Sequence, residues 1–316
     1  MKQITLGRTG IVTTATGLGC GGFSRLGLEK FGQVHAAGIV RAAYDLGIKF
    51  FDTATAYGTE PAVGAGLDGL PRDSYVVSTK FPIWEKTWRD GYQQRFEETL
   101  EASLRHLKTD YIDVYNIHGV SLEDYADVKK MLVPLMIKAQ DAGKIRFLGI
   151  TEGFMHDTSH KMLDVCLDDD IFDVIMVGYN LMNPSAAKTV FPRTIKNNVG
   201  VQCMFAVRHA LHDPVQMKAE IQKILDHGQG GEGLNATENA LDFLKEPGVA
   251  SSIMDAAYRY CAHTDGVHVV LTGTSNEHHL KDNLKSLESK ALPQAVLEKL
   301  NQLFGDVDCV CAQDTW

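Results

Sequence analysis

The chain has 316 residues, and 44% of them are hydrophobic, which is enough to build a large buried core. Its formal net charge of −9 excludes a general electrostatic attraction to nucleic acid or to anionic lipid. The first residues lack the apolar segment of a signal peptide, and the apolar runs are too short to span a bilayer. Six scattered cysteines favour a reducing compartment over a disulfide framework. We therefore expect a cytoplasmic protein without a nucleic-acid or membrane partner.

The first elements predicted are two short strands, residues 3–6 and 12–14, which flank a glycine-containing turn. After this hairpin, eight segments rich in β-branched and aromatic residues alternate with helical patterns. These predicted strands cover residues 16–20, 49–53, 75–79, 111–117, 146–150, 172–177, 199–205 and 268–272. The helical patterns place apolar residues three and four positions apart, as in Ile39, Ala43 and Leu46 after the first strand.

Eight strands that are each followed by a helix predict an α/β protein with a (β/α)8 TIM barrel. An N-terminal β-hairpin precedes the barrel, and a long loop region follows strand seven. An open doubly wound sheet is the alternative, but no Gly-x-Gly-x-x-Gly follows any predicted strand. We expect one domain over residues 1–316. The glycine-rich segment 227–235 is interpreted either as a mobile flap over a site or as a linker without a role.

Four polar side chains follow neighbouring predicted strands, at the end where barrels carry their active groups. Asp52 and Tyr57 follow strand two, Lys80 ends strand three and His118 ends strand four. Each alone could serve as a cap, an ion pair or a structural hydrogen bond, but together they favour an active site. A lysine would lower the tyrosine pKa, a carboxylate would hold the lysine, and an imidazole would orient a carbonyl oxygen. This group could protonate a carbonyl oxygen while hydride reaches the carbon, without a metal.

The motifs that contain these residues resemble the aldo-keto reductase family. They are Phe51-Asp52-Thr53-Ala54-Thr55-Ala56-Tyr57-Gly58, Ser78-Thr79-Lys80 and Tyr111-Ile112-Asp113-Val114-Tyr115-Asn116-Ile117-His118. The resemblance covers nearly the whole chain, and Ile150-Thr151 is similar to the branch of sugar dehydrogenases such as plant L-galactose dehydrogenase. It implies an NAD(P)(H)-dependent oxidoreductase that interconverts an alcohol and a carbonyl (an aldehyde, ketone or sugar). Tyr57 would be the general acid in reduction and the general base in oxidation.

The resemblance also implies where a nicotinamide cofactor would bind, with its adenosine end held by the loop and helix after strand eight. The implied contacts are Asp52, Thr151, Met204, Arg208, Gly273, Thr274, Ser275, Asn276, His279, Asp282 and Asn283. The resemblance favours NADP(H) over NAD(H), because this is the commoner cofactor in the family as a whole. However, His279 stands where members that prefer the phosphorylated cofactor often have arginine, and Lys281 is the nearby residue that could compensate.

Several positions depart from the commonest family pattern. Glu152 stands where the family often has asparagine, and Met176 where it often has glutamine. Met204 and Phe205 compete for the place of an aromatic residue that stacks on the nicotinamide. Arg208 is either a ligand of the cofactor pyrophosphate or part of a salt bridge on the rim.

Substrate contacts are expected from Trp84, on the loop after strand three, and from His118. The partner would be a small carbonyl compound or sugar, and the protein a monomer or small homo-oligomer. The pair His209 and His212 is interpreted as loop sequence, because two histidines are a weak metal signal. Two other functions stay open: a cofactor-binding sensor or regulatory subunit with little turnover, and a barrel isomerase or lyase without nicotinamide.

Overall fold

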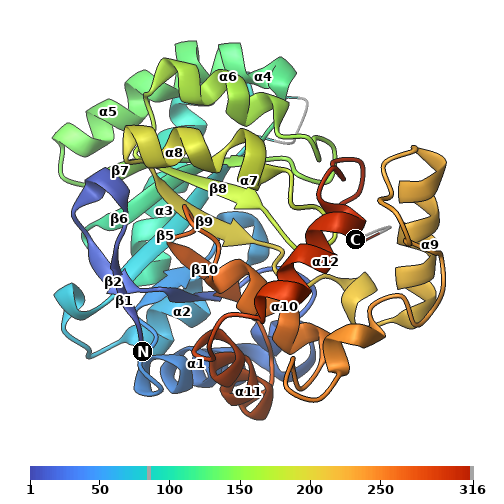
Figure 1. The fold of residues 1–316 in the computed structure, drawn as a ribbon. Coiled ribbons are helices and arrows are strands. Elements are labelled where there is room, and N and C mark those ends of the chain that lie inside the picture. The colour runs from blue at the N-terminus through green and yellow to red at the C-terminus, as the bar shows by residue number, and fades with distance from the viewer. Residues whose placement is uncertain (84–86, 314–316) are drawn as a thin grey trace.

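The computed structural model describes residues 1–83 and 87–313 and contains a closed barrel of parallel strands, as Figure 1 shows. Around the barrel the strands follow the order β10-β3-β4-β5-β6-β7-β8-β9. Their bounds are β3 Thr16–Gly19, β4 Phe50–Asp52, β5 Val76–Pro82, β6 Ile112–Val120, β7 Ile145–Glu152, β8 Val174–Gly178, β9 Gly200–Met204 and β10 Val269–Thr272. An antiparallel hairpin of β1 (Gln3–Thr5) and β2 (Val12–Thr14) precedes them. The predicted (β/α)8 barrel with an N-terminal hairpin is confirmed.

Helices surround the barrel, and their longest members show the apolar spacing that the sequence predicts (Figure 1). In chain order they are α1 Leu28–Asp45, α2 Glu60–Leu67, α3 Tyr92–Leu107, α4 Leu122–Asp127, α5 Val133–Asp141, α6 Lys161–Asp169, α7 Ala186–Thr189, α8 Phe191–Asn197, α9 Pro214–Asp226, α10 Ile253–Ala262, α11 Glu277–Leu287 and α12 Gln294–Phe304. Among the described residues, no helix is both long enough and apolar enough to cross a membrane.

The hairpin closes the N-terminal end of the barrel. Leu6 and Ile11, from its turn region, form a buried cluster with residues that open the strands, such as Phe50 and Val114. Gly17 on β3 allows this end to pack tightly, since a Cβ there would lie 2.8 to 3.0 Å from side-chain atoms of β4 and β10. With this end filled, the opposite end, where the strands finish, is left for a site.

Three strands run at least two residues further than the sequence predicts: β5, β6 and β7, the last of which ends at Glu152. β5 continues to Pro82 and β6 to Val120, because their parallel pairing continues through Lys80↔Asn116 and Pro82↔His118. Lys80 and His118 therefore lie inside strands, two residues before the strand ends, rather than at the ends. The regular backbone of the barrel holds both side chains.

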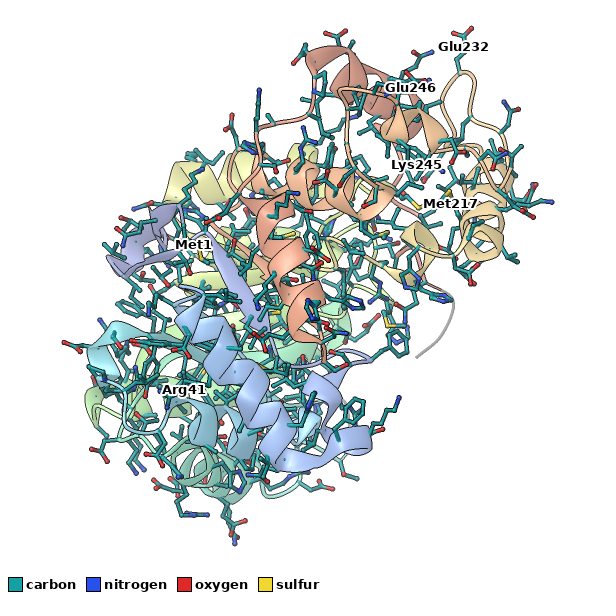
Figure 2. The ribbon with its side chains drawn as sticks, turned by 90° about the horizontal axis from the view of Figure 1, so that it is seen from below. Met1, Arg41, Met217, Glu232, Lys245 and Glu246 are labelled. Atoms are coloured by element: carbon teal, nitrogen blue, oxygen red, sulfur yellow. The ribbon has the colours of Figure 1, made fainter. Side chains whose placement is uncertain are left out.

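The region after β9 was predicted as a long loop, but it contains the thirteen-residue helix α9. Its start is marked by Asp213, whose carboxylate accepts hydrogen bonds from Val215 N and Gln216 N, and by Pro214 in the first turn. Helix α9 packs with α10, α12 and the C-terminal segment into a second buried cluster that includes Met217. Figure 2 shows this region as a separate bulge, with Glu232 and Glu246 at its outer side, far from Arg41 on α1.

The glycine-rich segment 227–235 is bound to this second cluster. Gly231 N donates to the carbonyl oxygen of Leu303 on α12 at 3.0 Å. The side chain of Gln229 pairs with Asp308, donating to its carboxylate at 2.5 Å and accepting from its backbone N–H at 3.0 Å. The segment is therefore anchored on α12 and on the chain that follows it.

Candidate active site

The four residues predicted as catalytic come together at the mouth of the barrel. Asp52 is the last residue of β4, and the short 3-10 turn Thr55–Tyr57 carries the Tyr57 ring back over the mouth. Gly21, in the loop after β3, must lack a side chain, because a Cβ there would lie 2.5 Å from the Tyr57 ring. The chain thus leaves room for this ring next to β5 and β6, which carry the other two residues.

Lys80 is fully buried, and its ammonium is paired with Asp52. Lys80 Nζ lies 2.8 Å from Asp52 Oδ1 and 2.7 Å from Asp52 Oδ2, and it also donates to the carbonyl oxygen of Thr53 at 2.6 Å. An ammonium has three N–H bonds, and these three acceptors can take all of them. Lys80 therefore reaches Tyr57 through its electric field, with Nζ 5.1 Å from the ring centre, rather than through a hydrogen bond.

Tyr57 and His118 form the polar contact that faces the mouth. The Tyr57 hydroxyl lies 3.2 Å from His118 Nε2, and the two rings are nearly perpendicular at 86°. A substrate oxygen placed beside both groups could hydrogen-bond to the Tyr57 hydroxyl and to His118 Nε2 at the same time. This convergence is the chemical core of the site.

Tyr57 and His118 are half-buried, and partial desolvation shifts the pKa of each. Desolvation raises the pKa of Tyr57 above its usual value, and the Asp52 carboxylate acts in the same direction. The net shift is upward, because desolvation and Asp52 outweigh the lowering of the Tyr57 pKa that the sequence predicts from Lys80. Desolvation also lowers the pKa of His118 well below its usual range, with Lys80 adding to the shift. At neutral pH, Tyr57 is therefore a protonated phenol and His118 a neutral imidazole.

Sequence reasoning missed the residues that support Asp52 from inside the barrel. Ser78 Oγ donates to Asp52 Oδ1 at 2.9 Å, and Asn116 Nδ2 donates to Ser78 Oγ at 3.0 Å. Both are buried and belong to the same strands as Lys80 and His118. The signal was available, since Ser78 and Asn116 each precede a predicted catalytic residue by two positions and so share its face of the strand.

A model of the Aldo/keto reductase family matches residues 17–304. The chain belongs to this family. It is 28% identical to L-galactose dehydrogenase of Arabidopsis thaliana over 316 residues, which cover 96% of this chain and 94% of that protein. It is 26% identical to L-glyceraldehyde 3-phosphate reductase of Escherichia coli, over 89% of this chain and 88% of that one.

Solved structures share the fold of this family member. Aldo-keto reductase AKR11C1 of Bacillus halodurans, in its holo form, aligns with a TM-score of 0.73 at 24% identity and covers 98% of both chains. An aldo/keto reductase of Klebsiella pneumoniae, solved in complex with NADP and acetate, aligns with a TM-score of 0.69 at 21% identity. That alignment covers 100% of this chain and 99% of the Klebsiella chain.

The carboxylate of Glu152, the residue that departs from the commonest family pattern, contacts residues of neighbouring segments. Its carboxylate accepts from Gly178 N on β8 at 2.7 Å and lies 2.9 Å from Nδ1 of His160. His160 Nε2 lies 3.0 Å from Ser185 Oγ, and all three side chains are buried. Thr151, one position earlier, is also buried and accepts from the backbone N–H of Gly119 at 2.7 Å.

The residues predicted to contact the nicotinamide and the pyrophosphate of a cofactor lie at and after the end of β9. Met204 is the last residue of the strand and is partly exposed. Phe205 follows in the left-handed region, with φ of 66°, and its ring centre lies 6.1 Å from that of Phe154. Arg208 is buried rather than on the rim: its guanidinium lies 3.9 Å from the Phe205 ring centre, and Nε donates to the carbonyl oxygen of Cys311.

The predicted adenosine-side residues follow β10, and several make contacts among themselves. Thr274 Oγ1 accepts from Asn276 N at 3.1 Å, while Asn276 Oδ1 accepts from His278 N. Asn283 Nδ2 donates to Thr272 Oγ1 at 2.9 Å. The rest of the predicted set lies on the same loop and helix: Gly273, Ser275, His279 and Asp282.

Two other sequence interpretations concern the surroundings of the site. Trp84, the predicted substrate contact, lies outside the described residues. The rings of His209 and His212 are 4.9 Å apart, with Asp213 beside His209 at 3.7 Å. Across residues 1–83 and 87–313, no group of three or more acidic, histidine or cysteine side chains is arranged to hold a metal ion.

Proposed function

We propose that this protein is an NAD(P)(H)-dependent oxidoreductase that interconverts a carbonyl and an alcohol, with Tyr57 as general acid and base. The observation that carries the proposal is the contact between the Tyr57 hydroxyl and His118 Nε2 beside the buried Lys80–Asp52 pair. Family membership supports the reaction class, since the named relatives are reductases and a dehydrogenase.

The residues present suit a nicotinamide dinucleotide. Arg208 is a buried cation against an aromatic ring, which is an environment in which a guanidinium binds phosphate well. We propose that it holds the pyrophosphate, that Thr151 and either Met204 or Phe205 contact the nicotinamide end, and that the loop after β10 holds the adenosine. When bound, the dinucleotide would supply the hydride in reduction and accept it in oxidation.

The proton step belongs to Tyr57. In reduction, its hydroxyl donates a proton to the substrate oxygen, which becomes the alcohol hydroxyl. His118 is neutral, so a proton on Nε2 can hydrogen-bond to the same oxygen and polarise the carbonyl before hydride transfer. The field of Lys80 stabilises the phenolate that forms, and Asp52 holds Lys80 in place. In oxidation the same groups act in reverse, with the Tyr57 phenolate as base.

We propose a small polyhydroxylated carbonyl compound, such as a sugar aldehyde, as the substrate class. Two relatives that align over most of their length act, by their names, on a sugar and on a sugar phosphate. His118 would contact the substrate oxygen, and Trp84 would provide part of the substrate pocket. A panel of aldoses, short hydroxyaldehydes and simple aldehydes would rank these substrates.

Replacement of Tyr57 tests the proposed reaction. Tyr57→Phe should lower kcat at least about a hundredfold, since it removes the proton donor, and should leave the Kd for NADPH within about twofold. Absorbance of the reduced cofactor measures turnover, and cofactor fluorescence measures binding.

Tyr44→Phe is the matched control, because Tyr44 lies at the end of α1 and bonds to Ser74. It should keep wild-type rates. Full activity of Tyr57→Phe would contradict the proton role. Tight cofactor binding by wild-type protein without turnover on any substrate would favour the sensor function instead.

A further inference from the structure

A cavity of about 600 Å³ lies between the start of α1 and the start of α11, outside the group formed by Tyr57 and His118. One wall comes from α1 and includes Lys30, Phe31 and His35. The facing wall comes from the segment after β10 and includes Ser275 and His279. The second wall consists of residues expected to hold adenosine, whereas nothing in the sequence analysis pointed to the first.

The two walls are held together at the base of the cavity. His35 Nε2 donates to the carbonyl oxygen of Ser275 at 2.9 Å, which ties α1 to the segment after β10. Gly27, with φ of 76°, lets the helix approach, since a Cβ there would lie 2.9 to 3.1 Å from atoms of Phe31, Ser275 and His35. These contacts fix the base of the cavity, and Lys30 and Phe31 belong to the first turn of α1, which a break at Gly32 (φ of 81°) separates from the rest of the helix.

The α1 wall presents an aromatic face to solvent. The Phe31 side chain is 51% exposed, which is unusual for phenylalanine, and its ring centre lies 4.7 Å from that of His35. The Lys30 ammonium lies 4.9 Å from the centre of the same ring. An aromatic face beside a cation suits a ligand with both a planar base and a negative charge.

The wall that faces α1 carries little positive charge. This wall consists of Ser275, Asn276, Glu277 and His279 and contributes neither a lysine nor an arginine. Lys281, which the sequence suggested as compensation, forms an ion pair with Glu277 at 3.0 Å. Lys30 forms no ion pair with a carboxylate within the described part of the chain. Lys30 is therefore the lysine of this cavity that is available to an anion.

We propose that Lys30 and His279, from facing walls of this cavity, bind the 2′-phosphate of NADPH while Phe31 packs against its adenosine. This inference rests on the proposed function. A charge-assisted bond from an ammonium to a phosphate distinguishes NADPH from NADH, which has a hydroxyl at that position. Lys30 thus supplies from α1 the cation that the loop after β10 lacks, and it makes the protein selective for NADP(H).

Binding constants of Lys30→Ala test this proposal. Its Kd for NADPH should rise about fivefold to tenfold at physiological salt, whereas its Kd for NADH should stay within about twofold. Adenosine 2′,5′-bisphosphate, titrated by calorimetry, should show the same loss without any nicotinamide. Lys285→Ala is the matched control, because it removes an exposed lysine from the last turn of α11, away from the cavity.

Phe31→Ala provides an independent test of cofactor binding in the same cavity. Because the adenosine is common to both cofactors, this variant should weaken NADPH and NADH by a similar factor. Equal effects of Lys30→Ala on both cofactors, or no effect on either, would overturn the role of Lys30 while dinucleotide binding itself persists. Absence of NADPH and NADH binding in the wild type would instead refute the proposed function, and this inference with it.

Discussion

The ammonium of Lys80 has acceptors for all three of its N–H bonds in Asp52 and Thr53. A lysine in this state cannot share a proton with Tyr57, and most of its charge is balanced locally. The tyrosine therefore behaves as a phenol in a desolvated environment, with its pKa raised rather than lowered. Such a group stays protonated at neutral pH and is available as a proton donor, whereas the phenolate that oxidation requires is scarce, which favours reduction over oxidation at neutral pH.

The pH dependence of the two directions follows from these charge states. Reduction requires protonated Tyr57 and neutral His118, whose pKa values are shifted up and down respectively. We expect kcat/KM for reduction to stay flat from about pH 6 to about pH 9. Oxidation requires the phenolate, so its rate should rise with pH across this range. Initial rates in buffers of constant ionic strength measure both profiles.

The control for these profiles is recovery of full activity after each sample returns to pH 7, which excludes unfolding. A bend in the reduction profile between pH 7 and pH 9, with activity lost on the alkaline side, would show that Lys80 outweighs desolvation and that the pKa of Tyr57 is lowered.

At the scale of elements, the unusual Glu152 has a structural explanation. Glu152 lies on β7, and its carboxylate joins this strand to two neighbours. These are β8, through Gly178 N, and the start of α6, through His160. Phe154 stacks on the His160 ring and contacts Phe205 after β9. The carboxylate therefore joins these elements, and through His160 and Phe154 the contacts continue to Phe205, whose ring lies against Arg208.

Glu152→Gln tests this role. The amide keeps one acceptor but points an N–H₂ group at a second donor, so a buried hydrogen bond is lost. We expect the free energy of unfolding to fall by about 2–4 kcal/mol. Urea titration followed by circular dichroism measures the change. Glu123→Gln, at an exposed position on α4, should change stability by less than about 0.5 kcal/mol. Equal stability of the two variants would show that the Glu152–His160 contact contributes nothing.

The strands and the grouping of the four residues proposed as catalytic could be predicted because both depend on local pattern. Alternating and continuous apolar runs define each strand, and Asp52 or His118 follows directly from where a run stops. The same logic failed for α9, where the capping signal of Asp213-Pro214 was present but was not used. Contacts between loops, such as Glu152 with His160, leave no periodic signal, so only the folded chain shows them.

At the scale of the whole molecule, a second buried cluster stands beside the barrel and is joined to it near Arg208. Ala210 N donates to Ala312 O at 3.2 Å, and Asn183 Nδ2 donates to Val310 O at 2.9 Å. Together with the bond from Arg208 to Cys311, these contacts fasten the C-terminal segment over the loops after β8 and β9. Stability of the second cluster should therefore be coupled to that of the site.

Gly231→Ala tests this coupling. A Cβ at position 231 would overlap the carbonyl oxygen of Gln302 on α12, so the glycine-rich segment must move. We expect the free energy of unfolding to fall by about 2–4 kcal/mol, with a single unfolding transition shifted to lower urea. Fluorescence and circular dichroism should report the same midpoint.

Gly38→Ala is the control for Gly231→Ala. Its Cβ would have open space on α1, and it should leave stability unchanged or raise it by up to about 1 kcal/mol. Two separate transitions in Gly231→Ala, one for each cluster, would contradict the coupling of the second cluster to the barrel.

The pairing of the first barrel strand, β3, with the last, β10, has a consequence for aggregation during synthesis. Thr16 on β3 pairs with Val270 on β10, so β3 leaves the ribosome long before its partner exists. An unpaired strand edge is a template for aggregation while it waits. β3 is four residues long and includes Gly17 and Gly19, which makes it a poor template. Gly17, which permits close packing in the finished barrel, is thus also expected to protect the nascent chain.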